Sequence, residues 1–204
     1  DFTFRNVESA SREYEHQRIQ VLSRILKHDC DVVVACMDAA LQYTIPPNEL
    51  EGRMIELKKG QTVSLEQVVQ SLVRCGYVRA EPIDGTGQFA VRGGILDFFT
   101  PDAPYPVRIE FWGDEIDTIG LFDLESQRRT ETVDAIMLAP SVEVLVDNPS
   151  ELADKIEKHA SSLRGKTAPK AKEILQMECD QLRNGRHFHC ADKYITMLYD
   201  RTAT

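Results

Sequence analysis

The sequence predicts a discontinuous α/β domain built from the two ends of the chain, with an α+β domain of mainly antiparallel strands inserted between them. Three observations predict this fold class. Strand and helix patterns alternate in the first part, short alternating strands separated by turns fill the middle, and helical periodicity dominates the last part. We expect an α/β part at residues 1–62, the inserted domain at 63–147, and a mainly helical part at 148–204 that rejoins the first.

The first part contains a β-α-β-α pattern. Asp1–Val7 is a predicted strand, and Ser9–His28 is a predicted helix with an apolar stripe that includes Ile19 and Leu22. The β-branched run Cys30–Cys36 is typical of a parallel strand buried on both faces. A short helix is expected at Asp38–Gln42, then a short helical or extended segment from Pro47 to Leu50, and a short strand at Met54–Leu57.

The middle part begins with a helix that has a clear start signal. Ser64 is a good N-cap residue, and Leu65–Arg74 carries apolar residues on one face. Strands are predicted at Tyr77–Ile83 and Gln88–Phe99, and a further extended segment at Arg128–Met137. One helix and a mainly antiparallel sheet make this part an α+β domain.

The strongest local signal lies in Gln88–Asp123, which predicts a β-ribbon with one patterned outer face. In Val107–Trp112 the alternation is strict, so Arg108, Glu110 and Trp112 point away from the predicted core. Gly113 follows at the first central position of a two-residue hairpin turn, where glycine is favoured. The chain then returns through a predicted strand to Phe122.

Past Val146 the pattern becomes helical. Asn148 or Ser150 can cap a helix over Glu151–Leu163, and Ala168–Arg183 has the periodicity of a longer helix. A short amphipathic segment is expected at Asp192–Tyr199. Gly165, Lys166 and Thr167 resemble the end of a phosphate-binding loop, but Ala160 stands where that loop needs glycine, so we expect no ATP site.

The run AVRGGILDFFTP…YPVRIEFWGDEIDTI closely resembles the domain shared by the excision-repair protein UvrB and the bacterial transcription-repair coupling factor. The flanking segments NVESASREYEHQRI, TIPP and HFHCADKYITMLYDRTAT resemble the coupling factor rather than UvrB. The resemblance implies a fragment of its N-terminal UvrB-like module. It also implies a UvrB-like first domain without ATPase motifs, interrupted by a domain like the second domain of UvrB.

The same resemblance implies that Arg92, Arg108 and Trp112 bind UvrA, the damage-recognition ATPase. The two arginines match the family by residue type, and Trp112 stands where the family often has Phe. Arginine offers forked donors to carboxylates, and tryptophan offers a large apolar area, so these residue types suit a protein interface. A merely solvated face would show the same alternation.

By resemblance, the function is recruitment of UvrA to stalled transcription complexes in nucleotide excision repair, in the cytoplasm. We expect no catalysis and no cofactor in this fragment. ATP and Mg²⁺ would belong to the motor domains of a full-length DNA translocase, and RNA polymerase and DNA would bind other domains. The alternatives are an ATP-dependent fragment of UvrB, direct DNA binding by the α/β part, and a structural spacer.

Composition limits these alternatives. The chain has 204 residues, 42% of them hydrophobic, and a net charge of −9, which disfavours non-specific nucleic-acid binding. It has no apolar run long enough to span a membrane, and its first residues are too polar for a signal peptide. Both ends have the character of a fragment. Reduced thiols and no zinc are expected from five irregularly spaced cysteines: Cys30, Cys36, Cys75, Cys179 and Cys190.

Three further groups are weaker candidates. His187, His189 and Cys190 could ligate a metal, but no fourth ligand is evident. The acidic turn residues Asp114, Glu115 and Asp117 are expected to be solvated. A basic patch or a salt-bridged surface could form from Arg74, Arg79, Arg128 and Arg129.

Overall fold

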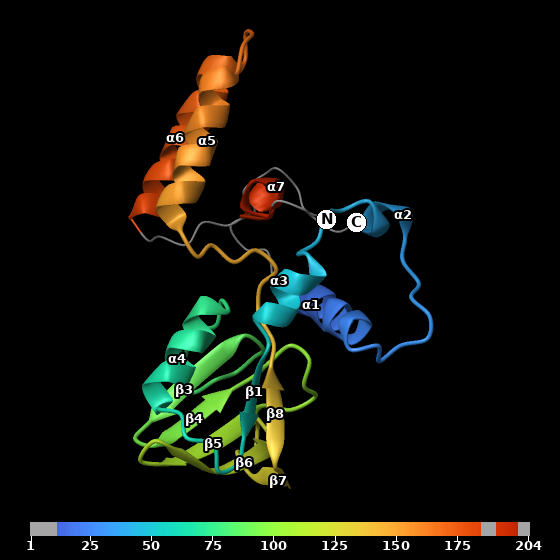
Figure 1. Ribbon diagram of the computed structural model, residues 1–204, viewed down its shortest axis with the longest axis vertical. Helices are drawn as coiled ribbons and strands as arrows, with labels where there is room; N and C mark the ends of the chain where they lie inside the picture. Colours follow the sequence, from blue (N-terminus) through green and yellow to red (C-terminus); the bar gives the residue numbers. More distant parts are fainter. Residues whose placement is uncertain (1–11, 185–190, 200–204) are drawn as a thin grey trace. The chain divides into compact units, whose positions relative to one another are not determined.

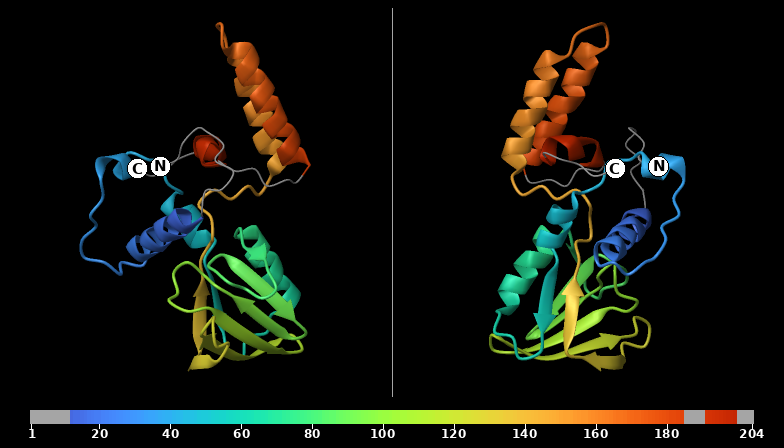
Figure 2. Two further views of the ribbon diagram at one scale, coloured as in Figure 1. Left: turned by 180° about the vertical axis from the view of Figure 1, so that it is seen from behind. Right: turned by 45° about the vertical axis from the view of Figure 1, so that its right-hand side comes forward.

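The computed structural model describes residues 12–184 and 191–199, and contacts between residues divide the chain into two units (Figures 1 and 2). We call them the sheet unit, Ser11–Ala35 and Pro47–Leu145, and the helical unit, which includes Cys36–Pro46 and Val146–Thr204. The protein is of the mixed α/β class, with both antiparallel and parallel strand pairs. The predicted strand Asp1–Val7 and the candidate ligand group His187–Cys190 lie outside the described residues.

The sheet unit is built on a six-stranded sheet in the order β2-β3-β4-β5-β6-β7. β2 runs parallel to β3, and the other neighbouring pairs are antiparallel. A separate two-stranded sheet pairs β1 with β8. The strands are β1 (Ile55–Lys58), β2 (Val78–Arg79), β3 (Gln88–Arg92), β4 (Ile95–Phe98), β5 (Val107–Trp112), β6 (Glu115–Phe122), β7 (Arg129–Val133) and β8 (Ala135–Leu138).

One face of the large sheet is covered by α4 (Leu65–Arg74) and by the β1–β8 pair (Figure 1). Burial of apolar surface between these layers is the main driving force for folding the unit. Val107 and Ile109 are fully buried, as the strict alternation of β5 predicts. The core combines residues from every layer: Leu57, Val68, Leu72, Tyr77, Phe89, Leu96, Phe98, Val107, Ile109, Ile116, Ile119 and Leu138.

The start of α4 is fixed by a capping box. The Ser64 hydroxyl accepts a hydrogen bond from the Gln67 N–H at 3.2 Å, and the Ser64 N–H donates to Gln67 Oε1 at 3.1 Å. These two bonds satisfy donors that the first helical turn leaves without partners. The predicted helix Leu65–Arg74 and its cap are confirmed.

Ser64→Ala should lower the free energy of unfolding by about 1 kcal/mol, because the N–H of Gln67 loses its acceptor. Urea unfolding followed by circular dichroism measures this loss. Ser150→Ala, at an exposed serine for which the described chain shows no side-chain hydrogen bond, is the control. A free energy unchanged by Ser64→Ala would show that the cap contributes nothing to stability.

The predicted strand Cys30–Cys36 is wrong. The segment has no strand structure, and Val32 and Val34 are 77% and 92% exposed. A parallel strand needs a hydrogen-bonded neighbour and helices over both faces, and nothing in the described ranges pairs with this run. The β-branched composition of Cys30–Cys36 alone is therefore not enough to predict a parallel strand.

Three other strands are also shorter or divided. Gln88–Phe99 was predicted as one strand, but the chain reverses at Gly93 (φ +59°) and forms β3 and β4. Tyr77–Ile83 contributes only β2, because Pro82 has no N–H to donate to a ladder. Arg128–Met137 divides into β7 and β8, which belong to different sheets.

The pairing of β1 with β8 affects the expected division of the chain. Residues 47–62 make contacts with the middle of the sequence, whereas we expected a boundary near Val63. The segment after β1 also lies along the β5–β6 hairpin, where Gln61 O accepts the N–H of Ile116. The three-part division stays a prediction, and the contacts place the start of the sheet unit before β1.

The remaining helices mostly follow the sequence pattern. In the sheet unit, α1 is tied to the loops by ion pairs from Arg18 to Glu143 and from Lys27 to Asp102. In the described ranges, no helix is both long and apolar enough to cross a membrane. The helices are α1 (Glu13–Leu26), α2 (Met37–Ala40), α3 (Pro47–Gly52), α5 (Pro149–Ser162), α6 (Ala168–Arg183), the 3-10 helix η1 (Ala191–Tyr194) and α7 (Ile195–Leu198).

Candidate protein-binding face

The three predicted site residues lie on the face of the large sheet opposite to α4. β4 lies between β3 and β5, so the strands that carry Arg92 and Arg108 are not direct neighbours. Asp97 on β4 is in register with Arg108 on β5, and residues opposite each other share a face. We call this surface the arginine face.

Asp97 brings the two arginines together. Its Oδ2 accepts hydrogen bonds from Arg92 Nη2 at 2.7 Å and from Arg108 Nη2 at 2.8 Å, and its Oδ1 accepts one from Arg108 Nε at 2.7 Å. The Asp97 side chain is 4% exposed, whereas that of Arg92 is 57% exposed. The carboxylate is therefore nearly removed from water and depends on both guanidinium groups.

Arg108 is held more tightly than Arg92. Its guanidinium lies 4.4 Å from the ring centroid of the buried Phe122, and its Nη2 also donates to Gln127 Oε1 at 3.2 Å. The hydrogen bond to Asp97 raises the pKa of Arg108 above its ordinary value, against the lowering effect of burial. Gln127 has φ +57°, an unusual conformation for a residue other than glycine, so the turn before β7 adopts a strained form where it meets Arg108.

Trp112 lies at the end of β5 on the same face. Phe111 packs against the core, and side chains alternate along a strand, so Trp112 points to the arginine face. Its exposed fraction is 85%. Gly113 follows with φ +62°, and the hairpin turn predicted at this position is confirmed. An indole this exposed at the end of a hairpin is available to a partner.

A further ion pair on this face involves Glu110, which lies between Arg108 and Trp112 in β5. Glu110 pairs with Arg129 of β7 across the intervening strand β6. A Cβ at Gly120 would lie 2.7 Å from Arg129 Nε, so the glycine leaves the space that the arginine side chain crosses. The arginine face thus carries two groups of ion-paired side chains, Arg92–Asp97–Arg108 and Glu110–Arg129.

Sequence reasoning placed Arg92, Arg108 and Trp112 on one outward face and missed the groups that hold the arginines. Asp97, Gln127 and Arg129 were not predicted as parts of the face. A signal existed for Asp97, because a carboxylate inside the apolar run ILDFF is expected to be paired when it is buried. Nothing in the sequence identified which arginines would pair with it.

Arg108→Ala should lower the free energy of unfolding by about 3 kcal/mol, because Asp97 stays buried and loses two of its three hydrogen bonds. Arg92→Ala should cost less than about 1 kcal/mol, because Arg92 is largely exposed. Urea unfolding of the two variants gives both values. Equal losses would contradict the unequal roles assigned to the two arginines.

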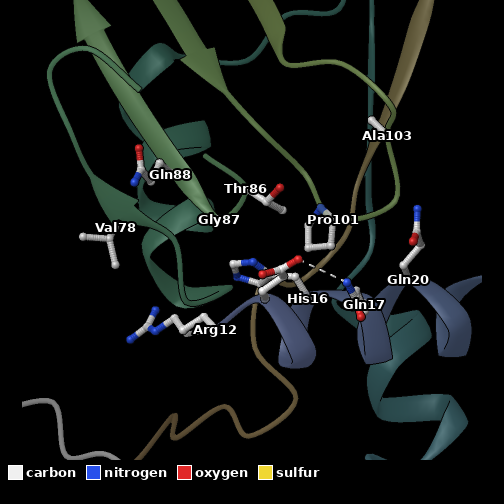
Figure 3. Close-up of a pocket in the computed structure, with 11 residues that line it drawn as sticks. Arg12, His16, Gln17, Gln20, Val78, Thr86, Gly87, Gln88, Pro101 and Ala103 are labelled. Carbon is white, nitrogen blue, oxygen red and sulfur yellow. Dashed lines mark hydrogen bonds between the residues drawn. The ribbon is translucent and has the colours of Figure 1, made fainter. Parts of the chain in front are cut away.

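A cavity of about 600 Å³ lies elsewhere in the sheet unit, beside α1 (Figure 3). His16 points from α1 toward Gly87, where a Cβ would lie 2.7 Å from His16 Nε2. That nitrogen is buried and has no hydrogen-bond partner in the described part of the chain. Burial and then the charge of Arg12 lower the pKa of His16. The lining includes Arg12, His16, Gln17, Gln20, Thr86 and Gln88.

The lowered pKa of His16 predicts a pH dependence of stability. The unfolded chain binds a proton near pH 6.5, above the folded pKa, so the free energy of unfolding should fall as the pH drops below about 6.5. His16→Gln should remove this part of the slope, which urea unfolding at several pH values measures. A wild-type slope retained in the variant would contradict it; His159→Gln, at an exposed site, is the control.

The other predicted groups give no catalytic arrangement. Gly165–Thr167 lies in the turn between α5 and α6, so it follows a helix and not the strand that a phosphate-binding loop requires. Arg79 and Arg129 form ion pairs with Glu81 and Glu110. Within the described ranges, no group of three or more His, Cys, Asp or Glu residues could hold a metal ion.

Comparison with known proteins gives a family for the sheet unit. Residues 55–143 match the family described as "UvrB interaction domain". The chain is 32% identical to the transcription-repair-coupling factor of Bacillus subtilis over 204 residues, and 41% identical to that of Mycobacterium bovis over 105 residues. It is 29% identical to UvrABC system protein B of Thermotoga neapolitana over 153 residues.

These matches cover most of this chain and a small share of the relatives. The three alignments include 96%, 50% and 75% of this chain, respectively. The chain spans 17% of the Bacillus protein, 8% of the Mycobacterium protein and 23% of the Thermotoga protein. The matched family region contains β1 to β8, and so it includes the whole arginine face.

Proposed function

Because residues 55–143 belong to the UvrB interaction domain family, in a chain related to transcription-repair coupling factors, we propose that this chain is a UvrA-binding module. The arginine face is the binding surface. Arg92, Arg108 and Trp112 make the contacts, and Asp97 holds the arginines in place. The module itself is non-catalytic.

One observation carries this proposal. Residues from two separate strands, β3 and β5, converge on one exposed face through the single carboxylate of Asp97. Such a preorganised pair of guanidinium groups loses little side-chain entropy when a partner binds. The exposed indole of Trp112 adds the apolar anchor that protein interfaces commonly centre on.

The geometry indicates the chemistry of the partner surface. Asp97 uses Nε and Nη2 of Arg108 and one nitrogen of Arg92, which leaves N–H groups of the largely exposed Arg92 available to a partner. Carboxylates are the acceptors that arginine binds most specifically. The UvrA surface should therefore present acidic side chains for the arginines and an apolar pocket for Trp112.

The wider context is also part of the proposal. The chain is a UvrB-like α/β domain interrupted by the UvrA-binding domain, and it recruits UvrA to stalled transcription complexes in the cytoplasm. ATP, Mg²⁺, RNA polymerase and DNA translocation belong to other domains of a full-length coupling factor. The names of the relatives, a transcription-repair-coupling factor and a UvrABC system protein, support this context.

Trp112→Ala and Arg92→Ala should each weaken binding of purified UvrA by about 30-fold, which corresponds to about 2 kcal/mol for an interface hot spot. Calorimetric titration of the chain with UvrA measures the change. Both side chains are mostly exposed, so both variants should fold normally. Arg108→Ala is a poorer test, because it also leaves Asp97 buried without its main partner.

Two matched controls exist in the same unit. Arg79→Ala removes an exposed arginine from β2, and Tyr105→Ala removes an exposed aromatic side chain from the loop before β5. Neither should change UvrA binding. Normal UvrA binding by a folded Arg92→Ala/Trp112→Ala double variant would refute the assignment of the face, and no binding by the folded wild-type chain would refute the proposed function.

A further inference from the structure

A concentration of positive charge lies at one end of the helical unit. α5 and α6 run antiparallel, side by side, and their connecting turn forms the tip of a hairpin (Figures 1 and 2). The segment from residue 158 to residue 172 contains five lysines and arginines and no acidic residue. We call it the basic tip; its cations are Lys158, Arg164, Lys166, Lys170 and Lys172.

This local charge is opposite to that of the chain. The net charge of the chain is −9, so the residues outside the basic tip carry a net −14. Four of the five cations are exposed, and Lys172 is half-buried. Because salt screens charges over about 10 Å, a ligand at the tip responds mainly to the charges within that distance of it.

The opposite end of the same hairpin is neutralised. Arg183 pairs with Asp154 at 2.8 Å and with Glu157 at 2.6 Å, and Lys155 pairs with Glu151 at 3.0 Å. The bond from Arg183 lowers the pKa of Glu157, so this carboxylate, next to Lys158 in sequence, is already engaged.

The basic tip has no such neutralisation. Among the described residues, no ion pair involves any of its five cations, although Glu173 follows Lys172 directly. Arg164 donates only to the carbonyl groups of Ser161 and Leu163 at the end of α5. The first turn of α6 has no acidic residue, and the Thr167 side chain makes no capping hydrogen bond. The positive end of the helix dipole adds to the charge of the lysines.

We propose that the basic tip binds the phosphate backbone of duplex nucleic acid, independently of sequence. Exposed cations without carboxylate partners match the regular negative charge of a duplex. The tip contains no Phe, Tyr or Trp, so it lacks the stacking platform used for single strands and the aromatic anchor of a protein interface. The surface is distinct from the arginine face, which belongs to the sheet unit.

Titration of the 204-residue chain with a fluorescent DNA duplex at several salt concentrations between about 50 and 200 mM tests this proposal. Five phosphate contacts predict that log K falls against log salt with a slope of about −4 to −5. Lys166→Glu/Lys170→Glu should weaken binding at low salt by at least about tenfold and reduce the steepness by about 2.

The matched control is Lys59→Glu/Arg74→Glu, which makes the same change of net charge at two exposed cations of the sheet unit. It should retain most of the DNA affinity. Equal weakening by both double variants would overturn the proposal, because net charge alone would then explain binding. So would absence of duplex binding at low salt, or equal competition by single-stranded DNA or polyglutamate.

Binding of UvrA provides an independent readout. Lys166→Glu/Lys170→Glu should bind UvrA like the wild type, because the arginine face is unchanged. The two proposals can therefore fail separately. The variants should also show the wild-type circular dichroism and thermal unfolding, since both substituted side chains are exposed and no ion pair of the described chain involves them.

Discussion

The buried carboxylate of Asp97 is the constraint on which the arginine face depends. Removing a carboxylate from water costs several kcal/mol, and opposite charges with good hydrogen-bond geometry must offset that cost. Arg92 and Arg108 provide this from two strands on either side of β4. A slip of one residue in the register of β4 would turn Asp97 into the apolar core, so the ion pairs also specify the register.

In the proposed interface Arg108 has two roles that use the same guanidinium group: it must satisfy Asp97 and also contact the partner. Its Nε and Nη2 satisfy Asp97, and its stacking on Phe122 restricts the rest of the side chain. A side chain already held in one conformation binds a partner with a smaller entropy cost than a free one. Arg92, more exposed and held by one bond, has more freedom to adjust to the partner. In the proposed interface, structural and binding roles are therefore divided unequally between the two arginines.

Local signals were read correctly from the sequence, and non-local ones were not. The Ser64 cap and the bounds Ala168–Arg183 follow from neighbouring residues, as does the outward position of Trp112. The strand predicted at Cys30–Cys36 failed because composition does not provide a neighbouring strand. The turn at Gly93 was missed, although Gly-Gly is a turn signal, because the apolar residues on both sides of it have the pattern of one continuous strand. Which residues pair with Asp97 depends on strand order, and the sequence does not encode that order locally.

The net charge of the chain is also a poor guide to what its surface binds, because a total says nothing about where the charges lie. A total of −9 disfavours contact with phosphate when the charges are spread evenly, but the charges here are separated along the helical hairpin. Ion pairs at its base engage Lys155 and Arg183, whereas the five cations of the tip have no ion-pair partner among the described residues. Salt screens charges over about 10 Å, so a phosphate bound at the tip responds mainly to the charges next to it. The distribution of charge, and not its sum, determines what such a surface attracts.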